Sequence, residues 1–154
     1  MPGRAAARFH RRRPVLPNRE CVGGNFASIS WRPQHLTKDG QVTENFLRLT
    51  TDVAPEYDQP APDKILSGAP EFTTWNVEDR DGIYCGTWRA TPGKWLVQYD
   101  EWEYCKILEG HSILTEDGGE SFELKAGDGF VIRRGFKGTW EVVETTIKEY
   151  VIQT

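Results

Sequence analysis

Glu103 is the residue of this chain with the strongest case for chemistry. Side chains alternate between two faces along residues 103–109, and Glu103 shares its face with Cys105 and Ile107, whereas Lys106 lies on the opposite one. Because a lysine is expected to face solvent, the face of Lys106 is predicted to be the outer one. Glu103 is therefore expected to point into the interior. A buried carboxylate is costly unless it is paired, ligated or hydrogen-bonded, and burial favours the protonated form that suits general acid–base catalysis. We therefore treat Glu103 as the candidate catalytic or ligand-anchoring residue.

Lys148 offers Glu103 a partner. Lys148 and Tyr150 share one face of a predicted strand over residues 146–152. A salt bridge from Lys148 to Glu103 would make both residues structural, whereas a free Lys148 would bind the carboxylate of a polar ligand. Cys105 is expected to be a small buried hydrophobe rather than a nucleophile, because no histidine lies near it in the sequence pattern to generate a thiolate.

Two tryptophans and two arginines complete the candidate residues. Trp140 shares its face with Val142, and Trp88 lies on another predicted strand. Both tryptophans are expected in the core, with a stacking platform for a planar or sugar ligand as the alternative. Arg133 and Arg134 are expected to be solvated loop charges, although a place at the rim of a cavity would also suit attraction of an anionic ligand.

Short β-type segments must position these residues. From about residue 71 onward, turn signals separate nine segments of strand character: 72–77, 83–90, 94–99, 103–109, 111–116, 120–124, 128–132, 138–144 and 146–152. The run HSILTEDGGESFEL is the clearest hairpin, with Asp117-Gly118 at its tip. No segment after residue 70 has a convincing helical period. The sequence predicts an all-β fold, a single small antiparallel sandwich or barrel.

The N-terminal part is predicted to contribute little regular structure. Residues 1–41 show no sustained period and are expected to form a basic, irregular and disordered extension. Residues 42–70 form a Pro-rich connector. A short amphipathic helix over residues 44–50 has a narrow apolar face of three residues, Phe46, Leu47 and Leu49. The β-domain itself is placed at residues 71–154.

Charge and composition narrow the function classes. The net charge of −4 hides an asymmetry, because residues 1–41 carry +6 and residues 42–154 carry −10. An acidic domain repels phosphate backbones, which disfavours nucleic-acid binding. The arginine-rich start could be a targeting or nucleic-acid-binding arm, or it could reflect a translation start assigned too far upstream of Val42.

Neither membrane insertion nor export is indicated. No apolar run approaches the roughly 18–20 residues of a membrane span, and no apolar signal stretch follows the first arginines. The three cysteines have no C-x-x-C spacing and indicate neither a disulfide framework nor a cysteine zinc site. These observations predict a cytoplasmic protein.

Four short runs occur in an order and at separations that resemble a cupin domain over residues 62–153. They are EYCKILEG, the EDGG hairpin, AGD and GFKGTWEV. The sequence is similar to the cupin type named after the (S)-ureidoglycine aminohydrolase cupin domain. This resemblance implies a single jelly-roll barrel.

The resemblance also bears on metal binding. Metal-binding cupins use three histidines and one glutamate, and Glu103 matches the glutamate position. No histidine stands at the other positions: Tyr99 and Glu101 are the nearest replacements for two of them, and Gly138 occupies the third. The resemblance therefore implies no metal cofactor. A divalent metal, if one bound, would use Glu103 with Glu101 or Cys105.

Three functions follow as hypotheses. In the first, the barrel binds a small polar metabolite without a metal. The ligand-binding residues expected beside Glu103 are Tyr99, Glu101, Cys105, Trp88, Trp140, Lys148 and Tyr150. The second is a metal-assisted hydrolase acting on C–N bonds of ureido-type compounds, against which the missing histidines count. The third is a dimeric accessory scaffold. A homodimer without nucleic-acid or membrane partners is expected in each case.

Overall fold

A computed structural model describes residues 45–154 of the chain. The elements in this part, in chain order, are β1 (Glu56–Asp58), a 3-10 turn η1 (Pro62–Lys64), β2 (Ile65–Gly68), β3 (Phe72–Arg80), β4 (Ile83–Ala90), β5 (Gly93–Gln98), β6 (Trp102–Glu116), β7 (Ser121–Lys125), β8 (Gly129–Ile132) and β9 (Lys137–Gln153). The predicted N-terminal extension, residues 1–41, lies outside the described residues.

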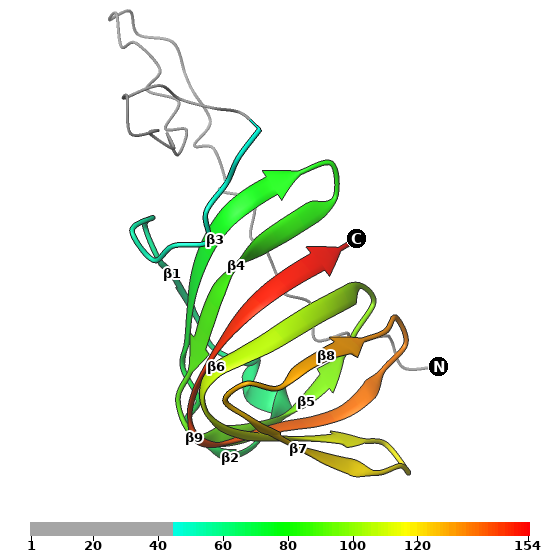
Figure 1. The fold of residues 1–154 in the computed structure, drawn as a ribbon. Coiled ribbons are helices and arrows are strands. Elements are labelled where there is room, and N and C mark those ends of the chain that lie inside the picture. Colours follow the sequence, from blue (N-terminus) through cyan, green and yellow to red (C-terminus); the bar gives the residue numbers. More distant parts are fainter. Residues whose placement is uncertain (1–44) are drawn as a thin grey trace, which may run out of the picture.

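The strands form one curled antiparallel sheet (Figure 1). Strand β9 lies at its centre: the C-terminal part of β9 pairs with β4 and β6, and its N-terminal part pairs with β5 and β6. Strand β6 also pairs with β7 and β8. The predicted all-β antiparallel barrel is confirmed, and so is the hairpin with Asp117-Gly118 at its tip, which β6 and β7 form.

The two longest strands each join two predicted ones. Strand β6 continues through Gly110, where the sequence pattern had suggested a turn. Gly110 has a φ of +88°, and a Cβ at this position would lie 2.2 Å from the carbonyl oxygen of Thr145 on β9. The register between β6 and β9 shifts at this point. The glycine therefore bends a continuous strand instead of ending it.

The Pro-rich segment is more ordered than its composition suggested. Strand β1 pairs with β3, and β2 pairs with β5, so both lie at edges of the sheet. The predicted helix is wrong over residues 45–50, which form no helix. Phe46 and Leu49 are exposed there, so the segment lacks the packed apolar face that stabilises most short helices.

Alternation assigned the faces correctly around the interior. Glu103, Cys105 and Ile107 are fully buried, whereas Tyr104 and Leu108 are exposed. The core that encloses them is rich in aromatic rings, which contact one another at centroid distances of 4.9 to 6.4 Å. Among residues 45–154, no helix has the length and apolar character needed to cross a membrane.

Candidate functional site

Strand register brings a charged cluster into the interior. On the inner face, Lys148 of β9 lies between Trp88 of β4 and Ile107 of β6, directly opposite both. Glu103 lies further along β6, opposite Ile152. The long lysine side chain therefore reaches along the strands to meet the carboxylate, and it passes the level of Cys105 on the way.

The cluster is a buried ion pair. The Lys148 ammonium donates to Glu103 Oε1 at 2.7 Å and to Cys105 Sγ at 3.3 Å. The side chain of Lys148 is 3% exposed and that of Glu103 is 0% exposed. The ion pair that the sequence offered as the structural alternative is thus present. Both charges are withdrawn from water, so each depends on the other.

Two indole rings flank the ammonium group. Lys148 Nζ lies 5.0 Å from the ring centroid of Trp88 and 4.7 Å from that of Trp140, and the two rings pack edge to face at 5.9 Å. Both distances lie within the range of cation–π attraction. The tryptophans are core residues, as expected, and they also complete the enclosure of the lysine.

The ionisation of the cluster follows from its burial. Burial raises the pKa of the Cys105 thiol, so this group stays protonated at neutral pH and is not a nucleophile. Burial opposes the charge of Lys148, but the Glu103 carboxylate in contact with it raises its pKa above the ordinary value. Burial and the neighbouring Glu103 carboxylate also raise the pKa of Tyr99. The cluster therefore holds one positive and one negative charge.

Some polar atoms of the cluster have no hydrogen-bond partner among residues 45–154. They are Oε2 of Glu103 and the indole nitrogens of Trp88 and Trp140, all of which are buried. Buried polar atoms in folded proteins normally have partners. The Tyr99 hydroxyl and the Cys105 thiol also interact with the Glu103 carboxylate, so this carboxylate has polar neighbours in the protein besides Lys148.

The remaining sequence candidates have other partners. Tyr150 is buried and its hydroxyl donates to Asn76 Oδ1 at 2.7 Å. Glu101 is half-buried and accepts a hydrogen bond from the backbone N–H of Asp100 at 3.0 Å. Burial and the nearby Glu103 raise the pKa of Glu101. Tyr150 is thereby fixed in the interior, while Glu101 belongs to the turn between β5 and β6.

The side chains around Glu103 do not fit the divalent metal that metal-binding cupins hold. Within residues 45–154, no three His, Cys, Asp or Glu side chains are grouped to hold a metal ion. His111, the histidine of this part, lies 3.8 Å from Glu123 and away from Glu103. At Glu103 itself, the Lys148 ammonium is already in contact with the carboxylate, and Cys105 is a protonated thiol. A dication would meet a positive charge there.

A cavity of about 680 Å³ lies beside the cluster, between β7, β8 and the loop that follows β8. All four residues of β8 (Gly129–Ile132) line it. Of these, Phe130 lies opposite Cys105, and Ile132 lies opposite Glu103. The ring of Phe130 also packs on Trp140 at 6.3 Å. The wall of the cavity is therefore a direct neighbour of the buried ion pair.

The residues lining this cavity differ from those selected from the sequence. None of the eight predicted catalytic or ligand-binding residues lines it, whereas Arg133 and Arg134 do. The hydrophobic lining residues are Leu114, Phe122, Leu124, Phe130, Val131, Ile132 and Phe136. Inward alternation along residues 128–132 could have identified Phe130, but the contribution of β7 and of the following loop depends on how the chain closes.

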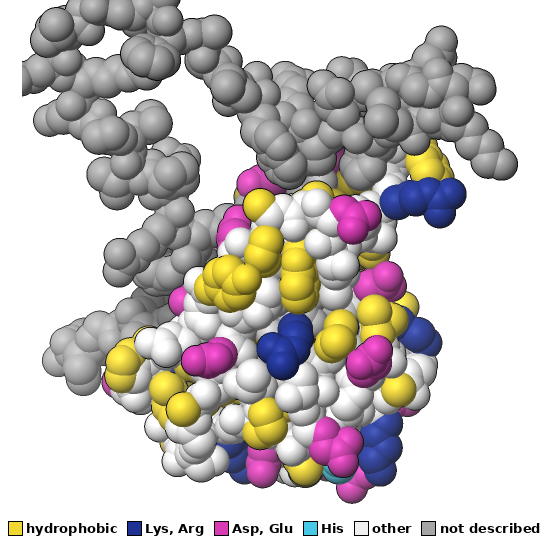
Figure 2. Space-filling view, turned by 90° about the vertical axis from the view of Figure 1, so that its left-hand side faces the viewer, with side chains coloured by type: hydrophobic (Ala, Val, Ile, Leu, Met, Phe, Trp, Pro, Cys, Tyr) yellow, Lys and Arg dark blue, Asp and Glu magenta, His cyan; other side chains and the backbone are white. Residues whose placement is uncertain are grey.

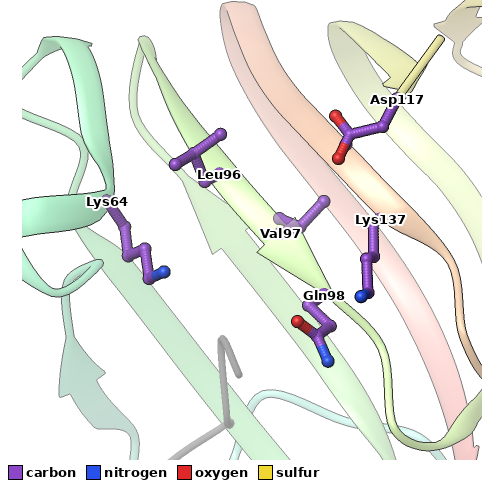
Figure 3. A pocket seen from close by; sticks show the side chains of 7 residues that line it. Lys64, Leu96, Val97, Gln98, Asp117 and Lys137 are labelled. Atoms are coloured by element: carbon purple, nitrogen blue, oxygen red, sulfur yellow. The ribbon is translucent and has the colours of Figure 1, made fainter. Parts of the chain in front are cut away.

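A second hollow lies on the outside of the sheet. It is about 130 Å³ and is lined by residues of η1, β5 and the start of β9. Figure 3 shows Lys137 near Asp117 on one side of it and Lys64 on the opposite side. It is small, and its charged side chains are of both signs. The larger cavity is the better candidate for a ligand.

The comparisons with known proteins support the cupin fold. The EutQ-like cupin domain family matches residues 77–150 of the chain. No curated protein sequence matches the chain.

Solved structures are similar in fold. A protein of unknown function of the DUF861 family from Pseudomonas syringae pv. tomato is 20% identical, with a TM-score of 0.62 over 68% of this chain and 46% of that one. The putative ethanolamine utilization protein Q of Salmonella typhimurium is 16% identical, with a TM-score of 0.51 over 66% of this chain and 96% of that one. The EutQ protein of Clostridium difficile is 16% identical, with a TM-score of 0.50 over 55% and 63%. The chain thus spans less than half of the first of these proteins, and the likeness concerns the fold.

Proposed function

We propose that this domain, which has the cupin fold, binds a small organic metabolite in the cavity between β7 and β8, without a metal. The observation that carries the proposal is the cavity itself. Its volume of about 680 Å³ is that of a small-molecule site. Through Phe130 and Ile132, its wall adjoins the strand that carries the buried Glu103 carboxylate.

The lining favours an organic acid with an apolar body. Leucine, isoleucine and phenylalanine side chains form the walls. Among the described residues, Arg133 is an exposed cation at the rim with no side-chain partner, whereas Arg134 donates to the carbonyl oxygens of Asp100 and Gln153. A guanidinium group with free N–H donors is well suited to a carboxylate.

Three acidic residues line the cavity, Glu116, Glu123 and Asp128, and the side chains of the last two are engaged with their neighbours. Glu123 pairs with Lys125 at 2.6 Å, and the Asp128 carboxylate accepts from the backbone N–H of Lys125 at 2.7 Å. Their negative charge is partly offset there, which leaves Arg133 available to a ligand.

A thermal-shift panel tests this function. Benzoate and butyrate are compared with the neutral amides benzamide and butyramide. We expect the acids to raise the unfolding temperature more than the amides do, because Arg133 adds a charged contact to the same apolar burial. Arg133→Gln should remove the difference, while Arg80→Gln, at another exposed arginine, should retain it. If no member of the panel stabilises the wild-type protein, the proposal is wrong.

The finer likeness to ureidoglycine aminohydrolase, with metal-assisted hydrolysis of a C–N bond, is a weaker alternative. It needs a metal at Glu103, and the Lys148 ammonium opposes one. Ammonia release from ureidoglycine in the presence of added manganese would support this alternative against ours.

We also propose that two copies of the chain associate through the outer face of β6 and β8. Tyr104 lies directly opposite Val131 on β8 and Val151 on β9, which makes an apolar row on that face. Tyr104 and Val131 are 38% and 45% exposed. Figure 2 shows one face of the molecule, on which groups of hydrophobic side chains lie among single charged side chains. An exposed apolar row is typical of an interaction surface.

Light scattering tests this association. The wild-type protein should have the mass of a dimer, and Tyr104→Asp should lower it to that of a monomer. Tyr57→Asp, at an exposed tyrosine of β1, serves as the control and should leave the mass unchanged. A monomeric wild-type protein would exclude the dimer.

A further inference from the structure

We infer that the barrel contains an ammonium-binding cage that the chain fills with its own Lys148. The cage consists of the Glu103 carboxylate, the Cys105 sulfur and the rings of Trp88 and Trp140. It is distinct from the ligand cavity at β8, and the inference does not depend on that cavity having a ligand.

The contacts around Nζ define the specificity of the cage. Two N–H groups are directed at Glu103 Oε1 and Cys105 Sγ, at 2.7 and 3.3 Å. The indole rings of Trp88 and Trp140 lie 5.0 and 4.7 Å from the same nitrogen. A carboxylate together with aromatic rings is the arrangement that recognises organic ammonium groups. Two indole rings supply no lone pair for coordinating a metal.

The charges around Glu103 favour a cation at this position. Glu103 is fully buried, and the other neighbours it has are neutral or acidic. Tyr99 carries a neutral phenol, Cys105 a neutral thiol, and Glu101 is a second carboxyl at the edge of the cluster. Without Lys148, the Glu103 carboxylate would have no counter-charge. The cage should therefore accept an external ammonium ion once the lysine side chain is shortened.

Chemical rescue tests the cage. Lys148→Ala removes the side chain beyond Cβ, and n-propylamine, protonated at neutral pH, replaces the deleted carbons and the nitrogen. We expect propylammonium to raise the unfolding temperature of this variant in a concentration-dependent manner, whereas 1-propanol, of similar size but neutral, has little effect. The wild-type protein should respond to neither.

Two control variants make the result specific. Lys148→Ala combined with Glu103→Gln should lose the rescue, because the counter-charge is gone. Lys94→Ala removes a lysine that pairs with Glu141 at 2.9 Å on a more exposed part of the sheet, and it should show no rescue. If Lys148→Ala does not fold alone, the yield of folded protein on refolding from urea is measured instead, with the same additives and the same expected order.

Three results would overturn the inference. One is equal rescue by propanol, which would show that only volume matters. Another is the absence of rescue in both assays. The third is a stoichiometric divalent metal in the wild-type protein that Glu103→Gln removes. A failure of the carboxylate panel would reject the proposed ligand, and it would leave these rescue results unaffected.

Discussion

Ile132 on β8 and Glu103 on β6 lie directly opposite each other. Ile132 lines the ligand cavity, and Glu103 anchors the buried ion pair, so one strand pair joins the two features. A ligand that displaces the side chains of β8 by a small amount would approach the Glu103 carboxylate. The stability of the barrel and the properties of the cavity are therefore expected to respond to overlapping sets of substitutions.

Glu103→Gln should destabilise the protein by about 3–5 kcal/mol, because it leaves the buried Lys148 without a counter-charge. Adding Lys148→Met should recover part of this loss, since the double variant buries no charge. Urea unfolding measures both. Glu141→Gln, which breaks the more exposed pair with Lys94, is the control and should cost under about 1 kcal/mol. Equal losses of stability for Glu103→Gln and Glu141→Gln would contradict the prediction that a buried ion pair costs more to break than an exposed one.

Stability should fall as the pH rises above neutrality. Cys105, Tyr99 and Lys148 all have raised pKa values in the folded protein. In each case the group loses its proton at a lower pH in the unfolded chain than in the folded protein. The folded protein therefore keeps its full stability below the pKa of the unfolded chain, and it loses stability as the pH rises from that value toward the pKa of the folded protein. The Cys105 thiol is the first of these groups to lower the stability, because its ordinary pKa is about 8.5. Above that pH, the free energy of unfolding should fall by about 1.4 kcal/mol per pH unit.

The alkaline prediction is checked by urea unfolding between pH 7 and 11. Cys105→Ala should flatten the profile between about pH 8.5 and 10, although its stability at pH 7 is lower. Cys85, whose pKa burial and Glu78 also raise, is less buried than Cys105. Cys85→Ala should consequently retain most of the slope. An unchanged profile for Cys105→Ala would show that the thiol is not withdrawn from water.

Phe130→Ala should have a much larger effect than Val131→Ala, although the two residues are adjacent. Phe130 points inward onto Trp140, whereas Val131 is 45% exposed on the outer face. We expect a cost of about 3–4 kcal/mol for the first and under about 1 kcal/mol for the second. Phe130→Ala should also extend the cavity toward Cys105 and favour larger ligands in the thermal-shift panel. Similar costs for both variants would mean that β8 has the opposite orientation.

Gly110→Ala tests the bend of β6. At this position a positive φ combines with a close approach to the carbonyl oxygen of Thr145. The expected loss is about 3 kcal/mol or more. Gly118→Ala is the matched control, because its φ of +71° is similar and no atom lies within 4 Å of an added Cβ. It should cost about 1–2 kcal/mol, as thermal unfolding will measure.

Local pattern in the sequence was sufficient for the class of fold and for the orientation of the interior residues. Glu103, Cys105, Trp140 and Lys148 were expected inside, and all four are buried. The physical reason is that side-chain direction along a strand repeats every two residues, and this period can be read without knowing the partner strand. Gly110 shows the limit of this reasoning, because the sequence alone does not distinguish a glycine that bends a continuous strand from a glycine in a turn between two strands.

Only the tertiary structure decided which residues meet. Lys148 and Glu103 are separated by 45 residues, and their contact depends on the register between β6 and β9. The cavity depends on the closure of β7, β8 and the following loop around apolar walls, which involves several independent pairings. Register and closure arise from the packing of the whole core. For that reason the sequence indicated a buried carboxylate, while the structure showed that its partner is an enclosed lysine and that the ligand cavity lies on the other side of Phe130 and Ile132.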